Sequence, residues 1–93
     1  MENGHERETA AKEVILLVDD EQDHLTITRR FLESQGYDCI CVDRGWEALK
    51  VLQERAVDLI LLDLNMPGMD GYCLAENILA REQFRNIPIV AFS

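Results

Sequence analysis

Short, almost wholly apolar runs recur along the chain. Residues 14–18 read VILLV and residues 58–62 read DLILL, a composition typical of strands buried on both faces. Residues 38–42 and 87–92 also have the composition of strands. The pattern therefore predicts four strands.

Amphipathic stretches separate these strands. The first follows the acidic loop 19–23 and ends at Gly36, a residue type that commonly terminates helices. Its apolar residues recur at near-helical spacing and are Leu25, Ile27, Phe31 and Leu32. This spacing predicts a helix.

Two further helices are predicted. One is capped by Asp43, runs to Glu54, and buries Ala48, Leu49 and Leu52. The other covers residues 72–84, with Leu74, Ile78 and Leu79 on one face. Because strands and helices alternate, with crossovers long enough for right-handed connections, we predict a doubly wound α/β fold with a parallel sheet.

The 93 residues are enough for one small domain. Residues 1–13 are mostly polar and charged without apolar periodicity, which predicts a flexible charged N-terminal arm. Residues 14–93 are predicted to form the folded domain.

Charge and cysteine content narrow the function classes. A formal net charge of -9 argues against direct nucleic-acid binding, and suits a divalent cation or an electropositive protein partner. We find no membrane-spanning segment.

Cys39, Cys41 and Cys73 form neither a CxxC pair nor an even set, so we predict a reducing, cytoplasmic setting. Cys39 and Cys41 are expected to face one side of the sheet as small hydrophobic residues.

Acidic residues follow two of the predicted strands directly. Asp19 and Asp20 come after the first strand, and Asp63 comes after the third. Ligands of open parallel sheets bind beyond the carboxyl ends of the strands, and the fourth strand leads to Ser93 at the same edge. If the first, third and fourth strands are neighbours, these side chains converge in one crevice.

A cluster of three carboxylates is tolerable mainly when a cation or shared protons offset its mutual repulsion, and a hard divalent ion is the natural occupant. Oxygen ligands without histidine or cysteine favour Mg²⁺, which a substrate phosphate can join. A carboxylate beside such an ion can attack phosphorus and form an acyl phosphate. Asp63 is the candidate nucleophile.

Three segments carry a family resemblance: LVDDE at 17–21, DLNMPGMDG at 63–71 and IVAFS at 89–93. They closely resemble the receiver (response-regulator) domains of two-component signalling. The resemblance runs from about Val14 to the last residue and implies the flavodoxin-like, CheY-like receiver fold.

The resemblance also implies residue roles. It makes Asp63 the phosphoacceptor, Asp20 a direct ligand of Mg²⁺, and Asp19 a metal-site acid that often acts through water. The backbone carbonyl of Asn65 completes the protein ligands. Three further positions match the family pattern, namely the phosphoryl-bonding switch hydroxyl Ser93 and the loop-shaping residues Pro67 and Gly71.

One departure concerns the lysine that receivers carry after their fifth strand. We expect residues 14–93 to lack the last crossover, strand five and helix five, so no residue of this chain takes the role of the lysine partner. Strand four is then expected to be an edge of the sheet.

The resemblance implies a signalling module rather than a turnover enzyme. A sensor histidine kinase or a histidine phosphotransfer protein would phosphorylate Asp63, and the conformational switch would control a downstream output domain or protein. One alternative is a haloacid-dehalogenase-like phosphohydrolase, although its DxD pattern after the first strand is absent from DDEQ at 19–22.

Another alternative is a non-phosphorylated interaction fragment, in which the exposed sheet edge pairs with another segment or with a second copy as a homodimer. His5 and His24 have no partner ligands nearby in sequence and are interpreted as surface histidines.

Overall fold

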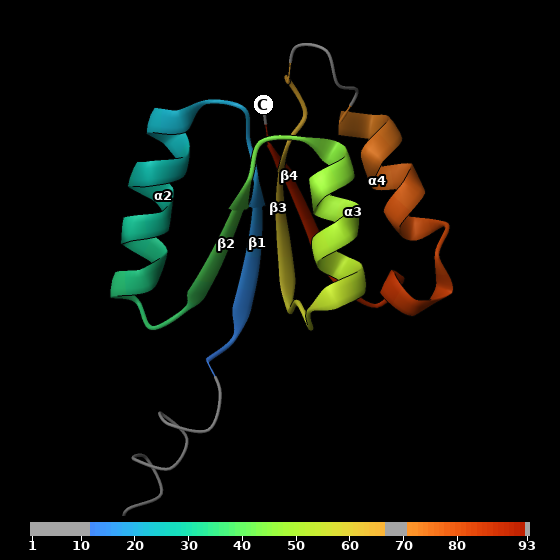
Figure 1. Cartoon of the computed structure of the whole chain (residues 1–93), viewed down its shortest axis with the longest axis horizontal. Coiled ribbons are helices and arrows are strands. Elements are labelled where there is room, and N and C mark those ends of the chain that lie inside the picture. The colour runs from blue at the N-terminus through green and yellow to red at the C-terminus, as the bar shows by residue number, and fades with distance from the viewer. Residues whose placement is uncertain (1–11, 67–70, 93) are drawn as a thin grey trace, which may run out of the picture.

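The computed structural model describes residues 12–66 and 71–92. Within them a four-stranded parallel sheet has the order β2-β1-β3-β4 (Figure 1). Its strands are β1 (Val14–Val18), β2 (Asp38–Val42), β3 (Leu59–Asp63) and β4 (Ile89–Phe92). Strands β1, β3 and β4 are therefore consecutive in the sheet, which meets the condition for their strand-end side chains to converge, and β4 lies at one edge.

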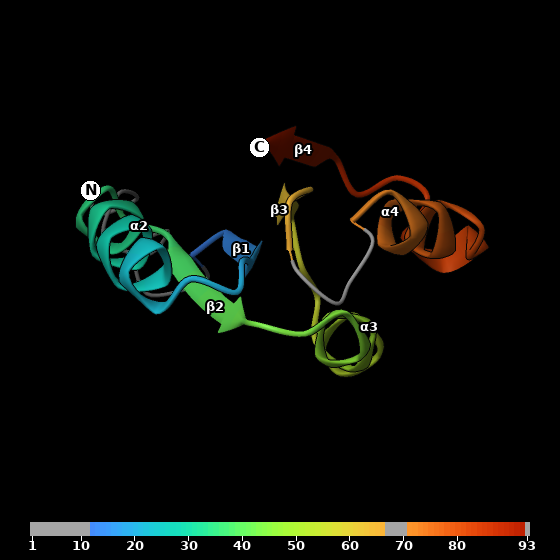
Figure 2. The ribbon, with the colours of Figure 1, turned by 90° about the horizontal axis from the view of Figure 1, so that it is seen from above.

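Helices cover both faces of the sheet. They are α2 (Gln22–Ser34), α3 (Gly45–Glu54), α4 (Gly71–Leu79) and the short 3₁₀ helix η1 (Glu82–Phe84). Figure 2 shows α2 on one side of the sheet, with α3 and α4 on the other. This arrangement confirms the predicted doubly wound α/β fold. No helix in the described part of the chain combines the length and apolar content needed to cross a membrane.

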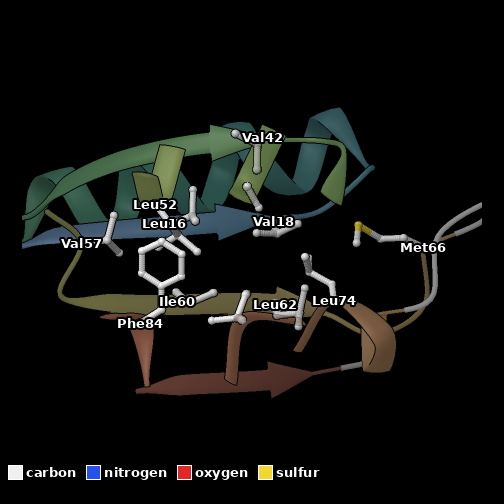
Figure 3. Packing of buried hydrophobic residues seen from close by; sticks show 12 residues of the cluster. Leu16, Val18, Val42, Leu52, Val57, Ile60, Leu62, Met66, Leu74 and Phe84 are labelled. Atoms are coloured by element: carbon white, nitrogen blue, oxygen red, sulfur yellow. The ribbon is translucent and has the colours of Figure 1, made fainter. Parts of the chain in front are cut away.

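The larger hydrophobic core lies between the sheet and the α3 and α4 layer (Figure 3). β1 and β3 supply its centre because their runs are apolar on both faces, and burying each such side chain fully stabilises the fold by about 1.5–3 kcal/mol. Its buried members are Leu16, Val18, Val42, Ala48, Leu52, Val57, Ile60, Leu62, Met66, Leu74, Ile78 and Phe84.

The face under α2 holds a smaller cluster around Leu17, Leu25 and Cys39. The helix predicted from the apolar spacing is present, but only part of its apolar set is covered, because Ile27 is 67% exposed and Phe31 is 62% exposed. At about 100° per residue, Leu32 lies within about 20° of Leu25 around the helix axis, whereas Ile27 and Phe31 are turned from Leu25 by about 160° and 120°. The two exposed residues therefore face away from the sheet.

The cysteines of β2 match their prediction. Cys39 is buried, and its Sγ lies 3.9 Å from the Sγ of Cys41, so both side chains share one face of the strand. Burial, and next the neighbouring Cys41, raises the pKa of the Cys39 thiol to about 12. Cys39 is thus a neutral, small hydrophobic residue.

Some predicted element ends differ in the structure. Asp43 does not cap α3, whose N-cap is Arg44 with no side-chain cap hydrogen bond. Instead, Asp43 accepts a hydrogen bond from Gln22 Nε2 at 3.4 Å. The cap is lost because the helix begins one residue later than Asp43 requires.

The predicted helix over 72–84 divides into α4 and η1. The chain turns after Leu79, which is 48% exposed, and this turn brings Phe84 into the core. β4 begins at Ile89 rather than 87 because Pro88 has no N–H to donate, although its carbonyl accepts the Ile60 N–H at 3.0 Å.

Candidate functional site

Three carboxylates meet at the carboxyl end of the sheet. One oxygen from each of Asp19, Asp20 and Asp63 lies within 4.8 Å of the others. Asp19 and Asp20 directly follow β1, and Asp63 is the last residue of the adjacent strand β3. The predicted convergence of the strand-end acids is therefore confirmed.

Two of these acids are buried, and each is held by its own turn of the same kind. Asp19 is 1% exposed and Asp63 is 8% exposed. Asp19 Oδ1 accepts the Glu21 N–H at 3.0 Å, and Asp63 Oδ1 accepts the Asn65 N–H at 2.9 Å. Each bond reaches the amide two residues ahead, which fixes the orientation of the carboxylate and leaves its second oxygen for other partners.

Backbone hydrogen bonds continue past the strand ends and anchor the acids further. The Asp19 N–H donates to the carbonyl of Val42 at 3.1 Å, and the Leu64 N–H donates to the carbonyl of Phe92 at 2.8 Å. The acidic loops therefore begin from backbone that is already paired with the neighbouring strand.

Gly71 packs against the backbone at the end of β3, beside Asp63 and Leu64. A Cβ built on Gly71 would lie 2.7 Å from the Cα of Leu64 and 3.0 Å from the carbonyl oxygen of Asp63. Only glycine lets α4 begin this close to the end of β3. The structure thus gives a steric reason for the predicted loop role of this residue.

Asn65 is exposed and lines the same cavity as Asp63. Pro67 and Ser93 lie outside the described residues, as do residues 1–11 of the predicted arm. Their predicted roles, and the metal role of the Asn65 carbonyl, stay predictions.

His24 is the residue that sequence reasoning missed. Its Nδ1 lies 3.3 Å from Asp19 Oδ2, and its Nε2 lies 3.8 Å from Glu21 Oε1. Its side chain is 60% exposed, as expected of a surface histidine, but that interpretation overlooks Asp19 and Glu21, which lie only five and three residues earlier. The available signal was its position in the first turn of the helix that follows the acidic loop, since that turn lies close to the end of β1.

A cavity of about 630 Å³ opens beside the acid cluster. Its lining is Asp20, Glu21, Gln22, Asp23, His24, Asp63, Asn65 and Phe92. A second cavity, of about 620 Å³, runs along α2 and mixes Arg29 and Arg30 with Glu33 and Glu47. The second cavity contains none of the clustered acids, so the chemistry belongs to the first.

The donor set of the cluster suits a hard cation. Three carboxylates offer oxygen atoms only, which favours Mg²⁺ over soft metals. In the described segments, no other group of three or more histidine, cysteine, aspartate or glutamate residues comes together in this way. The raised pKa of Cys39 keeps its sulfur protonated and makes the thiol pair of β2 a poor soft-metal site.

Comparison with known proteins gives a consistent family. The family model for the response regulator receiver domain matches residues 15–93. The chain is 40% identical over 82 residues to the sensor protein GacS of Pseudomonas syringae pv. syringae, covering 85% of this chain and 9% of that protein. It is also 40% identical over 77 residues to the sensor histidine kinase RcsC of Salmonella typhimurium, covering 83% of this chain and 8% of RcsC. The chain thus spans a small part of these relatives.

Solved structures of similar fold include two receiver domains. The first is the receiver domain of the sensor histidine kinase PA1611 of Pseudomonas aeruginosa, whose structure has a magnesium ion coordinated in the active-site cleft. It is 35% identical to this chain with a TM-score of 0.82, and the match covers 89% of this chain and 68% of that chain. The N-terminal domain of a receiver protein from Methanoculleus marisnigri is 34% identical with a TM-score of 0.84, over the same shares. A complex of the histidine kinase ThkA with the response regulator TrrA matches at 32% identity and a TM-score of 0.77, over 85% of this chain and 66% of that chain.

Proposed function

This chain belongs to the response regulator receiver domain family, and from that premise we propose that Asp63 accepts a phosphoryl group from a phosphohistidine. The observation that carries the proposal is the cluster of Asp19, Asp20 and Asp63 at the end of two adjacent parallel strands. Such a cluster is costly without a cation and a charged substrate to balance it.

The geometry of Asp63 suits a nucleophile. Its Oδ1 is held by the Asn65 N–H at 2.9 Å, which leaves Oδ2 for attack on phosphorus. In the proposed step an oxygen–phosphorus bond forms to Asp63 while the phosphorus–nitrogen bond of the donor breaks, and the electron pair of that bond returns to the imidazole. The product is an acyl phosphate on Asp63.

Mg²⁺ is the proposed cofactor, held by the carboxylates of Asp19, Asp20 and Asp63 and by the backbone carbonyl of Asn65. When bound, it offsets the charge that collects between the acids and the phosphoryl oxygens. The oxygen-only donor set and the magnesium in the similar PA1611 receiver support this assignment.

The proposed donor is a sensor histidine kinase or a histidine phosphotransfer protein. RcsC is a sensor histidine kinase, GacS is a sensor protein, and the ThkA–TrrA complex joins a histidine kinase to a response regulator. We expect the acyl phosphate to bias the conformation of the domain and so control a downstream output in the cytoplasm. Each chain takes up one phosphoryl group, so it acts as a switch rather than as a turnover enzyme.

Phosphorylation by acetyl phosphate with Mg²⁺, followed by intact-mass spectrometry, tests the acceptor. We expect the native chain to gain one phosphoryl group and Asp63→Asn to gain none while keeping its fold. Asp58→Asn is the matched control, because Asp58 is an exposed acid that immediately precedes the same strand, at the end opposite Asp63. Labelling of Asp63→Asn at the native level would remove Asp63 from the role.

Thermal unfolding with Mg²⁺ and the acyl-phosphate mimic beryllofluoride tests the pocket separately. A ligand at a hundred times its Kd stabilises the folded state by about 2.7 kcal/mol. We expect Mg²⁺ to stabilise the native chain, and Mg²⁺ with beryllofluoride to stabilise it further. In Asp63→Asn we expect the additional stabilisation by beryllofluoride to be lost. A cooperative fold that responds to neither would favour the interaction-fragment alternative.

A further inference from the structure

We propose that His24 is a positioning residue that holds the buried carboxylate of Asp19 in the orientation the metal site requires. The proposal rests on the proposed function, because it concerns the same acid cluster. It is carried by the 3.3 Å contact between His24 Nδ1 and Asp19 Oδ2, which joins the first turn of α2 to the end of β1.

Both oxygens of Asp19 have a partner when His24 is present. Oδ1 accepts the Glu21 N–H at 3.0 Å, and Oδ2 faces the His24 ring. With the imidazole removed, Oδ1 would keep its bond from the Glu21 N–H, whereas Oδ2 would lose the neighbour that faces it. Groups that hold a metal ligand from behind set its orientation, and their loss weakens metal binding without removing a ligand.

The two ring nitrogens of His24 have different neighbours. Nδ1 faces Asp19, whereas Nε2 lies 3.8 Å from Oε1 of the exposed Glu21. The side-chain nitrogen of asparagine occupies a position close to that of Nδ1, and that of glutamine reaches a position close to Nε2. Asparagine at position 24 should therefore keep the contact with Asp19, and glutamine should not.

His24 is well suited to such variants because its side chain is 60% exposed. Substitution leaves no cavity in the core, so the chain should fold in every case. Thermal unfolding without Mg²⁺ checks this point for His24→Asn, His24→Gln and His24→Ala.

The first readout is Mg²⁺ affinity, measured by calorimetric titration of the whole chain at one fixed pH. We expect His24→Ala and His24→Gln to bind Mg²⁺ about three- to tenfold more weakly, at or below the lower end of the effects seen for well-buried supporting groups. His24→Asn should stay within about twofold of the native chain. Equal affinity in all four proteins would overturn the proposal, as would tighter binding by His24→Ala, which would mean that the imidazole competes with the ion.

The second readout needs no metal. The Glu21 amide is bonded to Asp19 Oδ1, so its hydrogen exchange reports how firmly Asp19 is held. We expect faster exchange in His24→Ala and His24→Gln and native exchange in His24→Asn. The Asn65 amide, bonded in the same way to Asp63, is the internal control and should not change.

The two readouts separate the possible failures. If the native chain takes up no Mg²⁺, the proposed function fails, while Glu21 exchange still decides whether His24 holds Asp19. If the native chain binds Mg²⁺ but the Glu21 amide is indifferent to residue 24, the proposed function stands and the positioning role of His24 is wrong.

Discussion

The absent side chain of Gly71 leaves room for the backbone of Leu64, whose Cα would lie 2.7 Å from a Cβ at that position. We therefore expect Gly71→Ala to force α4 away from the end of β3 and to lower the free energy of unfolding by about 1–3 kcal/mol. Because Asp63 immediately precedes Leu64, Mg²⁺ affinity should fall as well. Denaturant unfolding and calorimetric titration measure the two effects.

Gly36 offers a control for this substitution. It has a φ of 94° with nothing within 4 Å of a built Cβ, so alanine there strains the backbone without a clash. We expect Gly36→Ala to cost about 1 kcal/mol and to leave Mg²⁺ affinity unchanged. Equal losses of affinity in both variants would contradict a local steric role for Gly71.

Asp58 and Val14 are joined twice at the amino end of the sheet. The Val14 N–H donates to Asp58 Oδ2 at 2.8 Å, and the Asp58 N–H donates to the Val14 carbonyl at 2.8 Å. We expect Asp58→Ala to lose about 1 kcal/mol of stability, and Asp58→Asn to lose less because its amide oxygen can still accept. Urea unfolding measures the stability of the native chain and of the two variants. Equal stability of all three proteins would count against the bond between the Val14 N–H and the Asp58 side chain.

Alkaline pH should destabilise the chain through Cys39. Burial raises the pKa of this thiol to about 12 in the folded protein, whereas an unfolded thiol has a pKa of about 8.5. Between these values the unfolded chain loses the proton that the folded chain keeps, so the free energy of unfolding falls as pH rises. The contribution is fully present below about pH 8.5.

Cys39→Ala isolates this effect from other groups that titrate in the same range. Its stability should fall less steeply between about pH 8.5 and the raised pKa than that of the native chain. Parallel pH profiles of the two proteins, obtained from urea unfolding, would show that Cys39 ionises as readily in the folded state as in the unfolded one.

The acid cluster should cost stability when no cation is present. Neutralising one member by Asp20→Asn removes repulsion from Asp19 and Asp63, and we expect metal-free stability to rise by about 1 kcal/mol. The increase in stability on adding Mg²⁺ should be smaller in this variant, because one carboxylate ligand of the ion is lost. Asp38→Asn, at an exposed acid that begins β2, should change neither quantity.

Leu25 lies on the side of α2 that faces the sheet, whereas Phe31 lies on a side that faces solvent. We expect Leu25→Ala to cost about 2–4 kcal/mol because Leu25 is 5% exposed and packs beneath the helix. Phe31→Ala should stay within about 0.5 kcal/mol, since Phe31 is 62% exposed. A large loss in the Phe31 variant would show that a partner or a second copy covers this face.

Much of the fold and site could be predicted from the sequence. Successive positions of β1 and β3, which point to opposite faces of the sheet, are apolar up to the strand-end acids. Apolar residues on both faces are typical of a strand that is covered on both sides. Parallel strands carry their carboxyl ends to one edge, so strand-end position predicted that Asp19, Asp20 and Asp63 would meet if their strands were neighbours, and the sheet order supplied that adjacency.

The tertiary structure decided the contacts that depend on how elements pack. Spacing predicts that Phe31 and Leu25 share a helix, but the sheet determines which side is covered. The same holds for His24, whose partner Asp19 lies on another element, and for Gly71, whose requirement comes from the backbone of Leu64. Periodicity and the order of the strands along the sequence are properties of the chain, whereas a contact across elements exists only once packing has fixed their separation.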